Sequence, residues 1–366
     1  MIQLKDICDI YDCPHTTAKD EGKGYPLVRT PNVGKGRLIF DGIHRVSEDV
    51  YNSRNARAIP EEGDLILARE APVGNVSIIM DGQRVCLGQR VVLIKPKREL
   101  VDPHFLTYYL LSAEVQHRLK NHANGAVVAH LNVSDIRNLW VTLPELEEQV
   151  AIGKILRSID DKIELNRQIN DNLEQQAREL FKAWFVNSPN ESWEEKSLSD
   201  FFNVITGKKD ANYSTKNGQY PFFTCSQDIL RAPSYSFDGH AILVAGNGDF
   251  NVKRYIGKFE AYQRTYVLIP YEKKYHSYLY LTLDHYLPDI TGGSRGSVIK
   301  FITKGNIADF KFKLPSRNID DKLEKLNSIY KIIDSNLKES HHLTELRDSL
   351  LPKLMSGELN INEIDC

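Results

Sequence analysis

The sequence has little of what marks secreted, membrane-spanning or disulfide-stabilised proteins. Its 366 residues contain no run of eighteen apolar residues, and the N-terminal segment MIQLKDICDI lacks a basic stretch followed by an apolar core. We therefore expect neither a membrane span nor a secretory signal. The five cysteines are odd in number and scattered, which predicts reduced thiols and a cytoplasmic protein. Cys8, Cys13 and His15 are irregularly spaced and no second pair follows, so we expect no metal site.

Catalytic motifs are missing as well. The segment Thr206-Gly-Lys-Lys209 has no earlier glycine at the distance that a phosphate-binding loop requires. The chain lacks the Asn-Pro-Pro-aromatic and Asp-Pro-Pro-aromatic tetrapeptides with which amino methyltransferases hold a target base, and it has no Gly-x-Ser-x-Gly or His-Glu-x-x-His. Because the formal net charge is only -2, a nucleic-acid surface would have to be a local patch.

A long amphipathic segment stands out among the features that are present. One helical period runs without proline from Glu145 to Phe185, which at about 1.5 Å per residue gives a helix of roughly 60 Å. Its apolar stripe follows the seven-residue repeat of a coiled-coil seam. The stripe has two rows, Ile152, Ile159, Asn166, Leu173 and Leu180, and Leu156, Ile163, Asn170, Ala177 and Trp184. Asn166 and Asn170 would fix register, and we expect leucine at both positions to raise stability but permit mis-registered pairing.

A second segment of this kind, residues 316–356, can supply the partner helix. Its stripe consists of Leu323, Leu326, Tyr330, Ile333 and Leu337, and then of Leu343, Leu346, Leu350 and Leu354. Gly357 is the predicted stop, and Pro352 should kink or loosen the final turns. The alternative is that each segment is an ordinary amphipathic helix on a core, but each is longer than a core usually demands.

The chain also contains an internal repeat whose unit is a mixed α/β domain followed by a long helix. Residues 125–144 match 296–315 without a gap, 89–96 resemble 263–270, and 63–68 align with 239–244. The expected strands are Asp64–Ala68, Val76–Met80, Arg90–Lys95, Ala241–Ala245 and Thr265–Ile269. The expected helices are Pro103–His122, capped by Asp102, and a helix near Ser277–Tyr286.

These patterns predict a mixed α+β fold of the α/β class, with two globular domains joined by two long antiparallel helices. The predicted segments are a first domain (1–142), a first helical spacer (143–187), a second domain (188–314) and a second helical spacer (315–366). The linker near Pro189 is too short for the return that parallel helices would need. We therefore expect the domains at opposite ends of the helix pair, related by an approximate two-fold axis.

Polar and basic side chains cluster in the loops of both predicted domains. Arginine can bond to guanine, and asparagine or glutamine to adenine, in the major groove, while lysine holds phosphates. The candidate DNA-binding residues are Arg29, Asn32, Lys35, Arg37, His44, Arg45 and Arg69 in the first domain, and Lys208, Lys209, Asn212, Tyr213, Lys216, Lys253, Arg254 and Arg295 in the second. Taken singly, each residue is better explained as a solvated loop residue, and it is the clusters as groups that favour DNA binding.

Two motifs carry a resemblance to a known family. The segments Leu156-Arg-Ser-Ile-Asp-Asp-Lys-Ile-Glu-Leu-Asn166 with Leu180-Phe-x-x-Trp-Phe185, and Leu346-Arg-Asp-Ser-Leu-Leu-Pro-Lys-Leu-Met-Ser-Gly-Glu-Leu359, are similar to the conserved helical regions of the specificity (S) subunits of type I restriction-modification systems. The resemblance covers the whole chain.

The resemblance implies a non-catalytic DNA-reading subunit whose two target recognition domains each read half of a split, asymmetric site. It also implies docking of two adenine methyltransferase subunits and of restriction-translocation subunits. Cofactors (S-adenosylmethionine, ATP and Mg) would belong to these partners and not to this chain. Charged residues on the outer face of the helix, Lys162, Glu164, Arg167 and Arg178, become candidates for the methyltransferase interface.

Two other functions stay open. A free-standing nuclease would need an unrecognised acidic site, for which Asp64 and Glu70 are the candidates, although their spacing is unremarkable. A coiled-coil adaptor would bind proteins and ignore DNA. DNA binding without cleavage distinguishes the specificity subunit from both, and such binding should weaken steeply with salt.

Overall fold

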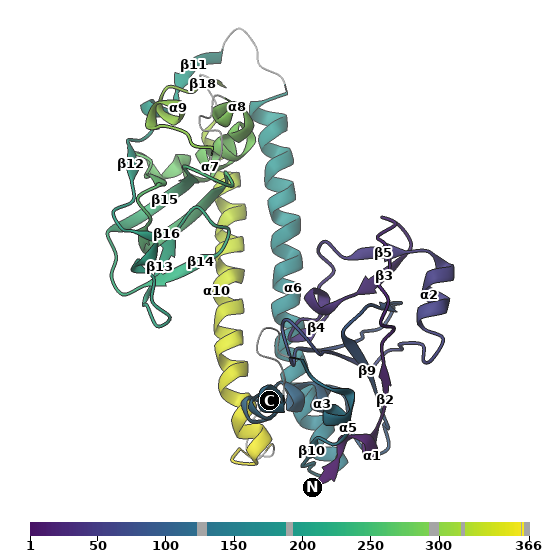
Figure 1. Cartoon of the computed structure of the whole chain (residues 1–366). Helices are drawn as coiled ribbons and strands as arrows, with labels where there is room; N and C mark the ends of the chain where they lie inside the picture. Colours follow the sequence, from purple (N-terminus) through teal and green to yellow (C-terminus); the bar gives the residue numbers. More distant parts are fainter. Residues whose placement is uncertain (123–129, 188–192, 293–299, 316–318, 360, 362–366) are drawn as a thin grey trace. The chain divides into compact units, whose positions relative to one another are not determined.

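The computed structural model describes residues 1–122, 130–187, 193–292, 300–315, 319–359 and 361. The chain divides into two compact units, unit 1 (residues 1–165 with 339–366) and unit 2 (residues 166–338) (Figure 1). Two long helices, α6 (Leu146–Phe185) and α10 (Asp320–Ser356), contribute to both units. The predicted division into four segments stays a prediction. Among the described residues, no helix is both long enough and apolar enough to span a bilayer.

Unit 1 is a mixed α/β unit built on a five-stranded sheet of order β2-β9-β6-β7-β4, with a three-stranded sheet β5-β3-β8 and a strand pair β1-β10. Its strands are β1 (Ile2–Gln3), β2 (Cys8–Asp12), β3 (Tyr25–Val28), β4 (Gly36–Arg37), β5 (His44–Val46), β6 (Leu65–Ala68), β7 (Val76–Ile78), β8 (Cys86–Leu87), β9 (Val91–Pro96) and β10 (Trp140–Val141). Its shorter helices are α1 (Leu4–Ile7), α2 (Glu48–Arg54), α3 (Pro103–Leu111), α4 (Ala113–His122) and α5 (Val133–Arg137).

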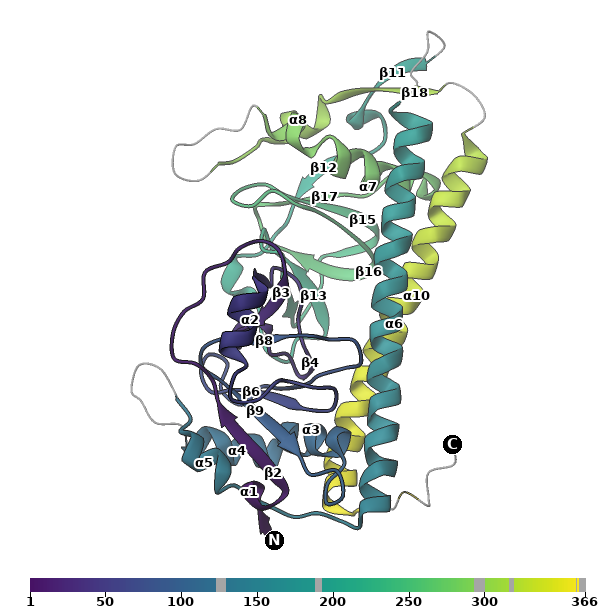
Figure 2. The same ribbon diagram turned by 90° about the vertical axis from the view of Figure 1, so that its right-hand side faces the viewer.

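The core of unit 1 lies between the sheet and the long helices, with α3 in the middle (Figure 2). Phe105 of α3 is 1% exposed and belongs to the same buried cluster as Ile152 and Leu156 of α6. The close approach requires Gly153, because a Cβ there would lie 2.5 Å from Asp102 Oδ1 and 2.9 Å from Phe105 N. A side chain at this position would therefore push α3 away from α6.

Unit 2 has the same architecture on a six-stranded sheet of order β12-β17-β15-β16-β13-β14, with a strand pair β11-β18. Its strands are β11 (Trp193–Ser197), β12 (Val204–Thr206), β13 (Tyr220–Phe223), β14 (Ile229–Ala232), β15 (Phe237–Ala245), β16 (Val252–Ala261), β17 (Thr265–Leu268) and β18 (Lys311–Pro315). Its shorter helices are α7 (His276–His285), α8 (Leu287–Thr291) and α9 (Lys304–Ala308).

The strand pairings confirm the internal repeat. The order β2-β9-β6-β7 in unit 1 corresponds to β12-β17-β15-β16 in unit 2, and the parallel pair β3-β8 corresponds to the parallel pair β13-β16. The match of 63–68 with 239–244 is wrong by one residue. Leu65 pairs with Ile94, and its counterpart Ile242 pairs with Leu268, so residue 65 corresponds to 242 and not to 241.

The two long helices pack antiparallel within each unit, as predicted. In unit 1, Arg347 Nη1 of α10 donates to Asp160 Oδ1 of α6 at 2.7 Å. In unit 2, Asn336 Nδ2 of α10 donates to Asn170 Oδ1 of α6 at 2.9 Å. Within unit 1, Lys162 also pairs with Glu339, and within unit 2, Lys322 Nζ lies 5.7 Å from the ring centre of Phe185. In each unit a higher number on α6 thus meets a lower number on α10, which defines antiparallel pairing. The predicted placement of the domains at opposite ends of the pair stays a prediction.

The buried face of the helices follows the predicted seam only in part. Ile152, Leu156, Ile159, Asn166, Asn170, Leu323, Leu326 and Ile333 are at most 8% exposed. Ile163, Leu173, Leu180, Trp184, Leu343 and Leu350 are only partly buried. Leu337 is 58% exposed, and its assignment to the seam is wrong.

The largest departure is at the end of α6, where Phe181 and Phe185 are buried in place of Leu180 and Trp184. An undistorted helix drifts by roughly 20° per heptad from an exact 3.5-residue repeat. Over the four to five heptads from Ile152, this drift amounts to roughly 90°. A strict heptad reading therefore points at the wrong flank of the stripe by the end of the helix.

The predicted strands and the helix near residues 277–286 are confirmed within a few residues, but the helix Pro103–His122 is wrong as a single element. It is interrupted at Ser112, which is extended (ψ 148°) and buried, so that α3 and α4 are separate helices. Asp102 caps α3 as predicted by accepting from Phe105 N at 2.8 Å. Gly357, at φ +72°, follows the end of α10 as predicted.

Candidate nucleic-acid interface

In unit 1, several of the predicted DNA-binding side chains hold the protein itself together. Asn32 is 3% exposed, and its amide accepts from Arg29 N and donates to Ile39 O, both at 3.1 Å. Arg37 forms an ion pair with Asp161 of α6. Asn32 is therefore a buried residue that shapes the loop, which corrects its predicted role. Arg37 docks the loop on α6, and its predicted contact with DNA stays a prediction.

Three other candidates of unit 1 differ in how accessible they are. His44 Nε2 lies 3.9 Å from Asp20 Oδ2, and Arg45 Nη1 donates to Gly24 O at 2.9 Å, so both side chains are held on neighbouring loops. Lys35 is exposed and lines a cavity beside the helices. Of these three, only Lys35 keeps its charge turned toward solvent.

In unit 2, the predicted cluster after β12 is accessible. Lys208, Asn212 and Lys216 are exposed. Lys209 Nζ lies 4.5 Å from the centre of the Tyr213 ring, a cation–π contact that leaves the ammonium at the surface. Lys253 is partly buried and donates to Ser226 O at 2.6 Å and to Asn251 Oδ1 at 2.5 Å.

Arg254 and Arg295 do not belong to this accessible set. Both terminal nitrogens of Arg254 donate to Asp334 of α10, at 2.7 and 2.8 Å, and its guanidinium lies 4.5 Å from the ring centre of Tyr330. Arg254 therefore joins the sheet to α10, which corrects its predicted role. Arg295 lies outside the described residues.

A different set of polar side chains meets at one end of the five-stranded sheet of unit 1, where β2 and β6 end and β9 begins. At its centre is Arg69, which is 6% exposed. Its Nε donates to Leu131 O at 2.8 Å, Nη1 to Asp12 Oδ1 at 2.9 Å, and Nη2 lies 2.9 Å from His130 Nε2. Arg69, a predicted DNA contact, is thus the buried centre of this end, and its neighbours form the surface.

Those neighbours surround a cavity of about 380 Å³ that is lined by His15, Arg69, Glu70, Gln89, Arg90 and His130. Glu70 accepts from His130 Nδ1 at 2.8 Å and forms an ion pair with Arg90, whose Nε lies 3.0 Å away. Gln89 Nε2 donates to His15 O at 2.5 Å, which fixes the turn before β9. The side chain of Arg90 remains 63% exposed.

The same end of the unit 2 sheet repeats this construction. Gln263 N donates to Lys209 O at 2.9 Å and Gln263 Nε2 donates to Asp210 Oδ1 at 2.8 Å, which ties the turn before β17 to the loop after β12. Gly246 N donates to Arg264 O, just as Arg69 N donates to Arg90 O in unit 1. Arg264, like Arg90, is exposed.

One contact at this end is made by different side chains in the two units. In unit 1, Arg69 Nε donates to Leu131 O. In unit 2 the counterpart of Arg69 is Gly246, and the counterpart of Leu131 O is Ile302 O, which accepts from Tyr266 Oη at 2.7 Å. The counterpart of Tyr266 in unit 1 is the small Val92. The equivalent carbonyl group is therefore satisfied from the neighbouring strand.

The Gln-Arg pairs, Gln89-Arg90 and Gln263-Arg264, are the residues that reasoning from the sequence missed as functional candidates. Both pairs occur in the matched segments 89–96 and 263–270, where they served only to establish the repeat. The signal was available, because arginine and glutamine at the first positions of a repeated segment are base-reading residue types. The sequence alone could not show that they lie in turns at the end of a sheet.

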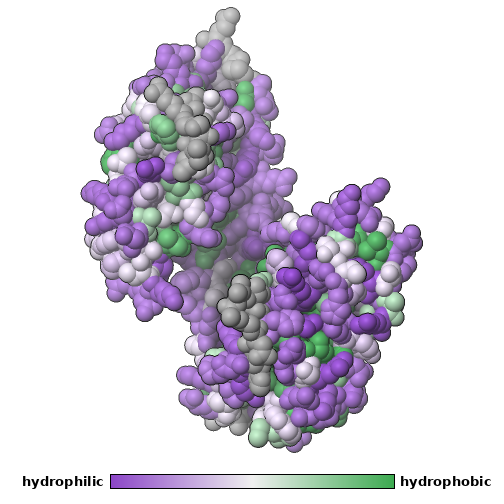
Figure 3. Space-filling model, in the orientation of Figure 1, coloured by the Kyte–Doolittle hydropathy of each residue, from purple (hydrophilic) through white to green (hydrophobic). Residues whose placement is uncertain are grey.

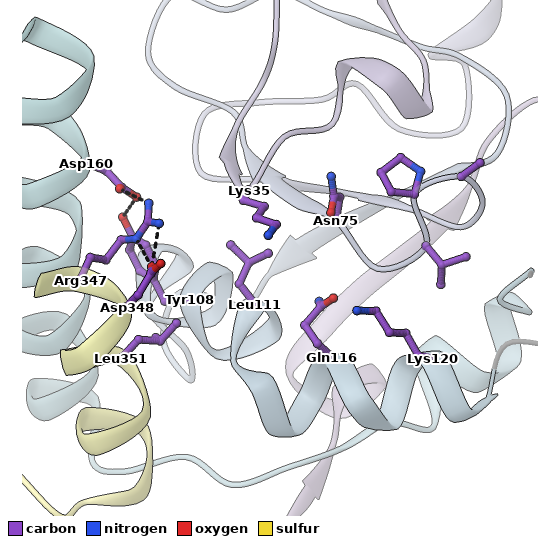
Figure 4. Close-up of a pocket in the computed structure, with 13 residues that line it drawn as sticks. Lys35, Asn75, Tyr108, Leu111, Gln116, Lys120, Asp160, Arg347, Asp348 and Leu351 are labelled. Atoms are coloured by element: carbon purple, nitrogen blue, oxygen red, sulfur yellow. Dashed lines mark hydrogen bonds and ion pairs between the residues drawn. The ribbon is translucent and has the colours of Figure 1, made fainter. Parts of the chain in front are cut away.

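A cavity of about 790 Å³ in unit 1 lies between α4, the loop near Pro72 and the long helices (Figure 4). At one end, Asp160 accepts from Tyr108 Oη and from Arg347 Nη1, both at 2.7 Å. Burial raises the pKa of Tyr108 well above its usual value, so the phenol stays a donor. Figure 4 shows that Lys35 and Lys120 lie on the side of the cavity away from Asp160 and the long helices.

The visible surface is largely hydrophilic with scattered small apolar patches (Figure 3). Within the described ranges, no three His, Cys, Asp or Glu side chains lie close enough to hold a metal ion. Cys8, Cys13 and Cys86 are buried free thiols, and burial raises the pKa of Cys8 to about 12 and that of Cys86 to about 11. These thiols are packing residues and not nucleophiles.

The sequence matches the family model of the type I restriction modification DNA specificity domain twice, over residues 1–175 and 190–344. The chain belongs to this specificity-domain family. The two matches coincide with the two halves of the repeat, each consisting of an α/β domain and the start or the body of a long helix. The predicted family and fold class are thereby confirmed.

Relatives within the specificity-domain family span the chain to different extents. The chain is 39% identical over 172 residues to the EcoDI specificity subunit of Escherichia coli, covering 46% of this chain and 38% of that protein. It is 24% identical over 410 residues to the MjaIX specificity subunit of Methanocaldococcus jannaschii, covering 99% and 94%. The fold matches the S subunit structure from M. genitalium with a TM-score of 0.65, at 17% identity and 96% and 95% coverage.

Proposed function

We propose that this chain is the non-catalytic DNA-reading subunit of a type I restriction-modification enzyme. Each α/β domain reads one half of a bipartite, asymmetric duplex site, and the paired helices set the distance between the halves. Two adenine methyltransferase subunits and the restriction-translocation subunits supply the chemistry, with S-adenosylmethionine, ATP and Mg as their cofactors. The observation that carries the proposal is the equivalent polar sheet end in each of two domains that match the specificity-domain model.

The composition of these sheet ends suits the reading of DNA by side chains. Arginine, glutamine and histidine present donors and acceptors to base edges, whereas lysine positions the backbone. Unit 1 presents Gln89, Arg90 and His130, and unit 2 presents Lys208 and Arg264. Two readers in one chain with different side chains account for an asymmetric site, since each unit would select its own half.

The nuclease alternative loses support from the positions of its two carboxylates. Asp64 and Glu70 flank opposite ends of β6, so they do not converge on one metal or water. Asp64 Oδ2 accepts from Lys95 Nζ at 2.7 Å, and Glu70 is paired with Arg90 and His130. The adaptor alternative remains, and the absence of DNA binding would select it.

Exposed apolar side chains on the long helices support a docking role. Leucine, isoleucine and valine at the surface of a helix favour a partner when they are rimmed by charge. In unit 1 these are Val150, Leu165 and Leu346, and in unit 2 they are Ile169, Ile332 and Leu337, all between 38% and 58% exposed. Among the charged candidates, Arg178 is already held by Asp284 of α7 at 3.0 Å and Lys162 by Glu339 at 3.4 Å.

The distance-setting role can be tested by lengthening both helices together. Seven residues inserted between Leu165 and Asn166 of α6, and seven between Lys338 and Glu339 of α10, add about 10 Å to each helix. This length corresponds to about three base pairs at roughly 3.4 Å each. Sites selected by the full chain from random duplex DNA should keep both half-site sequences and gain about three base pairs of spacing.

A matched control places the same seven residues between Glu358 and Leu359, beyond the end of α10, and should leave the spacing unchanged. An unaltered spacing in the doubly lengthened chain would refute the distance-setting role. A chain that selects no sequence at all would refute the DNA-reading function. Affinity for the selected site should also fall steeply as salt rises.

A further inference from the structure

An exposed arginine occupies the same position in both units, in the turn that leads into a central strand. Arg90 precedes β9 and Arg264 precedes β17. In each turn the preceding glutamine is tied back to the loop after the first strand of the sheet, through His15 O in unit 1 and Asp210 Oδ1 in unit 2. The turn is thus fixed by the glutamine, which leaves the arginine to face outward.

The guanidinium of Arg90 is oriented at one edge and open at the other. Its Nε lies 3.0 Å from Glu70 Oε2 in an ion pair, and Glu70 is itself held by His130 at 2.8 Å. No residue in the described part of the chain accepts a hydrogen bond from Nη1 or Nη2 of Arg90. The two terminal amino groups therefore form a pre-oriented fork, the geometry that matches O6 and N7 of guanine.

The backbone at Arg90 points to function as well. Its φ of +63° makes it the only non-glycine residue in the left-handed region among those described. Such a conformation is strained for a large L-residue and commonly marks a functional site. Since glycine would relieve the strain, the presence of arginine here points to a role for its side chain beyond the turn itself.

The surrounding charges favour base edges over phosphates as the ligand. Asp12 and Glu70 lie at the same end of the sheet as Arg90, with their side chains 24% and 14% exposed. Asp12 pairs with Arg69 and Glu70 with Arg90, so this end has no excess positive charge to attract a phosphate, whereas its carboxylates can accept from the amino groups of cytosine and adenine. A surface built only to grip the DNA backbone would be uniformly basic.

We propose that Arg90 and Arg264 are specificity-determining residues, each of which reads a guanine in the major groove of one half-site. This inference rests on the proposed DNA-reading function. The two arginines differ in two respects. Only Arg90 has a left-handed backbone, and the counterpart of Glu70 in unit 2 is Asn247, so that no described residue accepts from the guanidinium of Arg264. Arg90 is held in place and Arg264 is not, so Arg90 discriminates guanine from other bases more strictly.

The test is selection of binding sites from random duplex DNA by the full chain and by four variants. Arg90→Ala should lose one guanine preference in one half-site, with affinity for the wild-type site falling about 5- to 150-fold. Arg264→Ala should lose one guanine in the other half-site by a smaller factor. Arg90→Lys keeps the charge but not the fork, so it should lose the same preference as Arg90→Ala and keep the wild-type salt dependence.

Arg98→Ala is the matched control, since Arg98 is an exposed arginine just beyond the opposite end of β9, and it should select the wild-type site. A uniform loss of affinity over all sequences, with a salt slope lowered by about one, would identify a phosphate contact and overturn the proposal. An Arg90→Lys variant that selects like wild type would overturn it too. If wild type selects no site, the proposed function fails before this inference is reached.

Discussion

The ion pair between Arg347 and Asp160 gives the most stringent test of how α10 is held in unit 1. The side chain of Asp160 is 9% exposed and that of Arg347 is 20% exposed, with 2.7 Å between Arg347 Nη1 and Asp160 Oδ1. Arg347→Ala leaves the buried carboxylate with Tyr108 as its only donor among the described residues. Removing one partner of a buried pair costs about 3–5 kcal/mol. We expect about 3 kcal/mol, because the adjoining cavity of about 790 Å³ admits water to Asp160.

Hydrogen exchange at single-peptide resolution measures this effect where it occurs. A cost of about 3 kcal/mol corresponds to a roughly 150-fold loss of protection in the slowest amides of α3 and the first half of α6. The double variant Asp160→Asn/Arg347→Met removes both charges and should recover most of the protection. Arg157→Ala removes an exposed i,i+4 partner of Asp161 and should cost less than about 1 kcal/mol. Equal losses in Arg347→Ala and in the double variant would refute the reasoning, because the penalty would then not come from a stranded charge.

Three further predictions address the helix pair, the docking surface and the pH dependence of stability. Asn170→Leu alone should lower the thermal midpoint and cost about 1–2 kcal/mol of stability, because it leaves the Asn336 amide, which now donates to Asn170 at 2.9 Å, without an acceptor. Asn170→Leu/Asn336→Leu should recover the lost stability. The gain in stability expected from the sequence therefore needs leucine on both helices. Leu337→Asp should weaken co-purification with the methyltransferase subunits without changing the selected half-sites. Lys331→Glu, a change of charge on the same helix, should leave both the co-purification and the half-sites as in the wild type. Burial lowers the pKa of His276 from 6.5 to about 4, so between these pH values the unfolded chain binds a proton that the folded chain excludes. Stability should therefore fall by about 3 kcal/mol as pH drops from 6.5 toward 4, which urea unfolding at several pH values would measure. In His276→Gln the stability should depend less on pH over this range.

The long helices and the repeat were predictable because they rest on periodicity and order, which a sequence displays directly. The break at Ser112 was not, because Ser112 is compatible with a helix and its extended, buried backbone is imposed by the packing of α3 and α4. The same holds for Phe181 and Phe185, since a heptad count cannot tell how far the helix pair is supercoiled.

The candidate site was harder to predict for a related reason. Residue type alone made Asn32, Arg69 and Arg254 resemble surface readers, yet each is buried or bonded within the protein. Whether a polar side chain serves the ligand or the fold depends on which acceptors the backbone places around it. That information lies in strand register, which a single sequence does not contain.

The two sheet ends meet one backbone requirement with different side chains. The carbonyl group of Leu131 accepts from Arg69 in unit 1, and the equivalent carbonyl group of Ile302 accepts from Tyr266 in unit 2. Gly246 leaves room for the Tyr266 ring, because a Cβ on Gly246 would lie 2.9 Å from that ring. The requirement that a buried carbonyl be hydrogen-bonded is fixed, but the donor can come from either of two neighbouring strands. Each choice places different side chains around the turn that carries Arg90 or Arg264. The same backbone requirement is met by different donors, so residues around the turn can change without loss of the fold. Under the proposed function, this would let one repeated domain evolve into two readers of different sequences.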